Sequence, residues 1–205
     1  MIDPWLLLAF LPAALALNLT PGADMMFCLG QGLRAGPVPA MAASAGIALG
    51  SLIHAALAAL GVSALVAAAP WLFDVIRWVG VGYLLWLALG ALRQGRMQAK
   101  GRPMSAPRAF REGLIVNLSN PKVILFVLAF LPQFADPARA LLPQFLVMGC
   151  IMGIGGLFIN GAVGVFAGGL GRRMAGSPRF ARGLGLATAA IFTALAARLA
   201  ILERV

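Results

Sequence analysis

Two short stretches of this sequence place polar residues beside a proline within otherwise apolar sequence. The first reads NLTPGADMMF at residues 18–27, and the second reads NLSNPKVILF at residues 117–126. Proline removes a backbone donor from a helix, so each stretch leaves amide and carbonyl groups unpaired. Helix ends of this kind can bind the carboxylate and ammonium groups of a small zwitterion. The candidate substrate-binding residues are therefore Asn18, Thr20, Pro21, Gly22, Asn117, Ser119, Asn120 and Pro121.

Three ionisable residues stand in or near these stretches. Asp24 falls in the first turn after Pro21, where a carboxylate either caps a helix or carries a coupled proton. His54 is the only histidine and either bridges two helices or serves as a titrating or substrate-lining group, so Asp24 and His54 are the proton-coupling candidates. Lys122 extends its ammonium group toward the cytoplasm, neutralises Asp24 as a charge partner or, as a third alternative, contacts the substrate.

The composition places the chain in a membrane. Of its 205 residues 61% are hydrophobic and 11% are charged, and the mean hydropathy is +0.95. Soluble domains carry about 45–50% apolar and about 25% charged residues. Residues 38–69 and 142–170 contain no Asp, Glu, Lys or Arg, and apolar runs of about 18 residues or more indicate bilayer-spanning helices. We therefore expect an all-α integral membrane protein in contact with lipid.

Pro, Gly and charge clusters divide the apolar sequence into six predicted transmembrane helices. They cover residues 5–33, 39–67, 73–92, 109–134, 142–170 and 183–202. Basic loops face the cytoplasm, so both termini are predicted to be periplasmic. The net charge of +10 is explained by these loops and needs no nucleic-acid partner. The basic residues on the predicted cytoplasmic side are Arg34, Arg93, Arg96, Lys100, Arg102, Arg108, Arg111, Arg172, Arg173, Arg179 and Arg182.

The two proline stretches each open a block of three predicted helices. A three-helix unit enters the membrane on one side and leaves on the other, so a second copy runs upside down as an inverted repeat. The prediction is one transmembrane domain, 1–205, with repeat one at about 1–92, a basic loop at about 93–108 and repeat two at about 109–205. Helices one and four would be broken at Pro21 and Pro121. Two ordinary proline kinks are the alternative interpretation.

Small residues recur on two of the predicted helices. Gly46 and Gly50 form a GxxxG pair on the same face as His54, which lets another helix approach closely. The fifth helix carries a glycine stripe that includes Asn160, either for packing or to line a pathway. Because such stripes pack helices within and between subunits alike, a homodimer is left open.

The chain resembles the LysE/RhtB family of bacterial amino-acid exporters. The likeness rests on TPGADMMF, on Gly46 and Gly50 with His54, on GVGYLLWLALGALR and on NLSNPKVILFVLAFLPQF. It implies a six-helix carrier in the bacterial inner membrane that exports amino acids or their derivatives by alternating access, driven by the proton gradient. Two positions depart from the pattern: Ala23 stands where many relatives have a second proline, and Ser51 where an acidic residue often stands. If that acid serves coupling elsewhere, its role here falls to Asp24.

Two other function classes fit the sequence less well. A transmembrane thiol–disulfide electron carrier of the DsbD/CcdA type needs paired cysteines in equivalent helices, but Cys28 and Cys150 lie in helices one and five. A divalent-metal exporter needs clustered ligands, whereas one histidine and six acidic residues are scattered here. We therefore expect a carrier of a small molecule, not an enzyme, without a metal or cofactor.

The predicted topology can be tested with reporter fusions. A reporter placed after Gln98 or Gly176 should report a cytoplasmic location, and one placed after Val205 a periplasmic location, because the basic loops stay in the cytoplasm. Paired alkaline phosphatase and fluorescent-protein fusions measure this. A cytoplasmic reporter signal at Val205 would remove one span and, with it, the inverted repeat.

Overall fold

A computed structural model of the chain describes residues 3–68, 72–93, 102–136, 138–167 and 177–201. All regular structure in these ranges is helical. The elements are α1 Pro4–Leu19, α2 Ala23–Ala35, α3 Pro37–Ala68, α4 Leu72–Arg93, α5 Ala106–Leu118, α6 Pro121–Phe130, the short 3-10 helix η1 Leu131–Phe134, α7 Leu141–Val165 and α9 Pro178–Ile201.

Two to four membrane spans can be recognised in the described residues. Two uninterrupted helical segments, Pro37–Gly61 and Leu141–Val165, are long and apolar enough to cross a bilayer. Two more spans are counted if each bent helix pair crosses as one: α1 with α2, bent by 51°, and α5 with α6 and η1, bent by 53°. Both breaks lie where Pro21 and Pro121 predicted them. The fold is thus all-α and membrane-like, while six spans in an inverted repeat stay a prediction.

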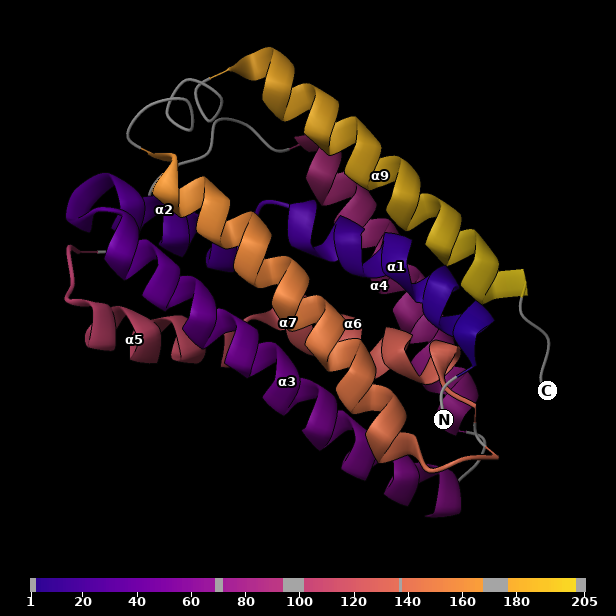
Figure 1. The fold of residues 1–205 in the computed structure, drawn as a ribbon. Coiled ribbons are helices and arrows are strands. Elements are labelled where there is room, and N and C mark those ends of the chain that lie inside the picture. The colour runs from indigo at the N-terminus through magenta and orange to yellow at the C-terminus, as the bar shows by residue number, and fades with distance from the viewer. Residues whose placement is uncertain (1–2, 69–71, 94–101, 137, 168–176, 202–205) are drawn as a thin grey trace.

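Several helix ends that carry arginine lie at one end of the molecule (Figure 1). At the upper-left end α2, α4 and α7 finish, and α3, α5 and α9 begin. The last turns of α2 and α4 carry Arg34 and Arg93 there, and α9 begins with Arg179 and Arg182. The start of α1 and the end of α9 lie together at the opposite, lower-right end. These four arginines thus lie at one end of the molecule, whereas Arg96, Lys100, Arg172 and Arg173 of the predicted basic loops lie outside the described residues.

The outside of the helix bundle is largely apolar. Trp5 is 79% exposed, Phe158 is 70% exposed and Leu57 is 60% exposed. Exposed large apolar side chains of this kind suit contact with lipid. Inside, Phe10 of α1 packs edge-on against Phe134 with ring centroids 5.5 Å apart, which joins the first broken helix pair to the second.

Glycines let α3 and α5 pack with their backbones in contact. A Cβ atom on Gly46 would collide with the carbonyl oxygen of Phe110, and one on Gly113 with the carbonyl oxygen of Ala43. A Cβ atom on Gly50 would lie 2.5 Å from Oδ1 of Asn117. The prediction that Gly46 and Gly50 admit a neighbouring helix is confirmed, and the neighbour is the half-helix that ends at the second break.

This contact predicts a difference between two glycines of α3. Gly46→Leu should lower the free energy of unfolding by about 1–3 kcal/mol, because an overpacked interface must shift. Gly61→Leu is the matched control, since nothing lies within 4 Å of a Cβ atom placed there. Thermal unfolding of both variants in detergent measures the difference. Equal unfolding temperatures for Gly46→Leu and the parent would contradict the close α3–α5 contact.

Candidate functional site

The first helix break exposes the carbonyl end of α1. Thr20 ends this helix, and its hydroxyl donates to the carbonyl oxygen of Ala16 at 2.5 Å. Gly22 precedes α2 in extended backbone, with φ −160° and ψ −167°. The last carbonyl groups of α1 have no helical amide to accept from, so other donors must satisfy them.

At the second break, the side chain of Asn120 caps the helix that follows. Asn120 caps α6, and its Oδ1 atom accepts from the backbone amide of Lys122 at 3.0 Å. The backbone amide of Ser119 donates back to the carbonyl oxygen of Ile115 at 2.9 Å. Asn120 is therefore a helix cap here, and Ser119 is exposed on the α5 side of the break.

Lys122 connects the two breaks. Its Nζ atom donates to the carbonyl oxygens of Leu17 at 2.9 Å and of Thr20 at 2.8 Å. A Cβ atom on Gly22 would lie only 3.2 Å from this Nζ atom, so a glycine at that position leaves room for the ammonium group. Lys122 therefore caps the α1 end of the other break, and its pairing with Asp24 and its contact with substrate stay predictions.

The carboxylate of Asp24 accepts a hydrogen bond from the side-chain amide of Asn117. Asp24 is 7% exposed, and its Oδ2 atom accepts from Nδ2 of Asn117 at 3.0 Å. Within the described part of the chain, Oδ1 of Asp24 and Oδ1 of Asn117 are buried without a hydrogen-bond partner. Asp24 therefore lies in the first turn of α2, as predicted, and faces the second break with one carboxylate oxygen unsatisfied.

His54 reaches the same asparagine from α3. Its Nε2 atom lies 3.2 Å from the carbonyl oxygen of Asn117. The interhelical contact predicted for His54 is confirmed. Asn117 thus contacts Asp24 through its side chain and His54 through its backbone, which brings both proton-coupling candidates onto one residue.

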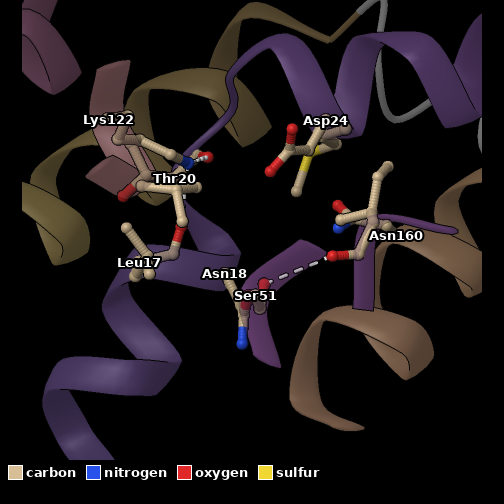
Figure 2. Close-up of a pocket in the computed structure, with 10 residues that line it drawn as sticks. Leu17, Asn18, Thr20, Asp24, Ser51, Lys122 and Asn160 are labelled. Carbon is tan, nitrogen blue, oxygen red and sulfur yellow. Dashed lines mark hydrogen bonds between the residues drawn. The ribbon is translucent and has the colours of Figure 1, made fainter. Parts of the chain in front are cut away.

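A small polar cavity lies between the breaks (Figure 2). Its volume is about 10 Å³, and the side chains of Asp24 and Lys122 border it from two different helices. A space of this size holds about one water molecule and no amino acid. The polar residues that line the cavity are Asn18, Thr20, Asp24, Ser51, Lys122 and Asn160.

Two asparagines named in the sequence analysis and one serine also line the polar cavity. Asn18 lines the cavity while its Nδ2 atom donates to the carbonyl oxygen of Met152 in α7 at 3.1 Å. Asn160, which the sequence left between packing and pathway, also lines the cavity and is 3% exposed. Ser51 was marked in the sequence only as a departure from the family pattern. In the structure Ser51 is 6% exposed and lines the cavity from α3.

The cysteines do not meet. Cys28 is buried in α2, Cys150 is exposed on α7, and both are free thiols. Among the residues that the structure describes, no three His, Cys, Asp or Glu side chains are close enough together to hold a metal ion.

The Lys122 contacts predict a stability effect. Lys122→Met should lower the free energy of unfolding by about 1–3 kcal/mol, because the carbonyl groups of Leu17 and Thr20 lose a charged donor inside the protein. Arg111→Met, on the exposed face of α5, is the control. Circular dichroism during heating in detergent measures both. An unchanged unfolding temperature for Lys122→Met would mean that other groups satisfy these carbonyls.

Comparisons with known proteins point to one family. A family model described as LysE type translocator matches residues 15–203. An uncharacterized membrane protein of Vibrio cholerae is 35% identical over 151 residues, which cover 72% of this chain and 73% of that protein. A homoserine/homoserine lactone efflux protein of Salmonella typhimurium is 31% identical over 144 residues, 69% of this chain and 70% of that protein. A leucine efflux protein of Klebsiella pneumoniae is 36% identical over 135 residues, 63% of each.

No solved structure matches the chain. The family assignment therefore rests on sequence, and the matched region contains both helix breaks, the cavity between them and the α3–α5 contact. The resemblance drawn from the two proline motifs is confirmed, and the chain belongs to the LysE family of translocators.

Proposed function

We propose that this protein exports amino acids or their close derivatives across the bacterial inner membrane, by proton-coupled alternating access. The relatives named for homoserine, homoserine lactone and leucine efflux support the substrate class and the direction. Six spans in two inverted repeats, with both termini periplasmic, are part of the proposal. The grouping of the arginines of α2, α4 and α9 at one end of the molecule supports that topology.

The observation that carries the proposal is the ammonium group of Lys122 at the end of α1. Two carbonyl oxygens, of Leu17 and Thr20, hold it at 2.9 and 2.8 Å. A pair of acceptors that holds one primary ammonium group can hold another, including the α-ammonium group of an amino acid. Lys122, once displaced, is the nearest cation for the substrate carboxylate. When the ammonium group of the substrate replaces that of Lys122 at the carbonyls, each charged group still has a partner away from water.

Transport requires the site to open. The cavity of about 10 Å³ between the breaks admits no amino acid in this conformation. The two half-helix pairs, bent by 51° and 53°, meet at the breaks. Rotation of a half-helix about its break widens the site without breaking a continuous hydrogen-bonded ladder. We therefore assign this conformation to a closed step of the cycle.

Asp24 is the proposed proton carrier. It borders the cavity, and one of its buried carboxylate oxygens lacks a partner among the described residues. Protonation supplies a donor at that carboxyl group, and deprotonation restores a negative charge near the ammonium site. Asn117 contacts both Asp24 and His54. His54 is then the second candidate for coupling.

Asp24→Asn tests the coupling. The variant keeps the size and hydrogen-bonding capacity of the side chain but cannot titrate. We expect it to exchange amino acids across the membrane and to lose export against a concentration gradient. Proteoliposomes with an imposed pH gradient measure both activities.

Glu112→Gln is the matched control, since Glu112 lies on α5 in an exposed pair with Arg108 at 4.0 Å. It should accumulate substrate like the parent. If Asp24→Asn also accumulates substrate at the parental rate, Asp24 does not carry the proton, and coupling must be sought at His54. If the parent moves no amino acid in either assay, the proposed function itself is wrong.

A further inference from the structure

A second cavity lies on the other side of the breaks, against α4. Its volume is about 200 Å³, and we call it the side pocket. Thr20, Pro21 and Gly22 of the first break line it, as do Pro121 and Lys122 of the second. Its remaining wall comes from α4. The side pocket is therefore far roomier than the polar cavity and shares its boundary.

The α4 wall of the side pocket is apolar and aromatic. Tyr83 and Trp86 stack with their ring centroids 5.4 Å apart, and Leu87, 6% exposed, lies beside them. The Tyr83 hydroxyl donates to the carbonyl oxygen of Pro121 at 3.4 Å, which ties this wall to the second break. An apolar cavity of about 150 Å³ can bind benzene. The side pocket thus has room for a side chain of the size of leucine or phenylalanine.

Thr20 and Lys122 line both cavities. A ligand held by its charged groups at Lys122 and the α1 carbonyls would have its uncharged part directed toward one cavity or the other. The polar cavity admits only about one water molecule, so the side pocket is the space that remains.

We propose that the side pocket binds the apolar side chain of the exported amino acid and sets the preference for aliphatic or aromatic substrates. This inference rests on the proposed function. Trp86 is 63% exposed, so the side pocket opens toward the apolar surface, and a lipid acyl chain is the competing occupant. The ammonium group of Lys122 at its inner boundary favours the amino acid, because an acyl chain brings no negative charge to that depth.

Two glycines of α4 allow a matched test. Nothing lies within 4 Å of a Cβ atom placed on Gly90 or on Gly82, so both positions accept a larger side chain. Both glycines are exposed. Gly90 lines the side pocket, whereas Gly82 does not. Gly90→Leu therefore adds an apolar side chain at the border of the side pocket, and Gly82→Leu adds the same side chain to the same helix away from it.

The experiment measures efflux of L-leucine and of L-alanine from proteoliposomes, for the parent and for each variant. One methylene group in an apolar pocket changes selectivity by about 10-fold or more. Gly90→Leu should therefore lower the leucine-to-alanine rate ratio by at least about 10-fold, and Gly90→Ala should lower it by less. Gly82→Leu should keep the parental ratio. If Gly90→Leu does not fold, Gly90→Ala carries the test.

Three results would overturn the inference. An unchanged ratio in well-folded Gly90→Leu and Gly90→Ala would mean that the side chain binds elsewhere. An equal loss of leucine and alanine export would indicate a lipid site or a structural role. A parent that exports L-serine but neither leucine nor alanine would exclude an apolar side-chain pocket while leaving the proposed export function intact. A parent that exports no amino acid at all would instead refute the proposed function.

Discussion

Everything at the centre of this protein depends on satisfying the carbonyl groups at the broken end of α1. In an apolar environment an unpaired backbone carbonyl costs several kcal/mol, so a helix cannot simply stop there. The ammonium group of Lys122 meets this need from the other half of the chain, through the carbonyls of Leu17 and Thr20. The two breaks are thereby held face to face.

The second pairing follows from the first. Once α6 is anchored at the end of α1, Asn117 at the end of α5 lies against the start of α2 and donates to Asp24. The close contact between α3 and α5, which depends on Gly46, Gly50 and Gly113, places His54 against the same asparagine. Packing of small residues thus fixes the positions of polar groups that lie far apart in the sequence.

The arrangement also explains why the site combines polar and apolar character. Donors and acceptors gather at the breaks, where helix geometry leaves backbone groups unpaired. Apolar and aromatic side chains come from α4, which passes the breaks without interruption and forms a separate wall. Lys122 lies at the boundary between them, so charge recognition and side-chain recognition meet at one residue.

The sequence by itself determined the membrane environment, the helical class, the positions of both breaks and the family, because composition, proline and local motifs act over short distances along the chain. It also identified Asp24, His54, Asn117 and Lys122 as candidate site residues. Only the tertiary structure decided their partners. Lys122 donates to the carbonyl oxygens of α1, Asn120 is a cap, and Ser51 and Tyr83 join the cavity walls. These outcomes depend on how α3 packs on α5 and how α4 passes the breaks. The glycine spacing of α3 predicts a close neighbouring helix, but a single sequence does not say which helix that is, because the partner lies far away along the chain.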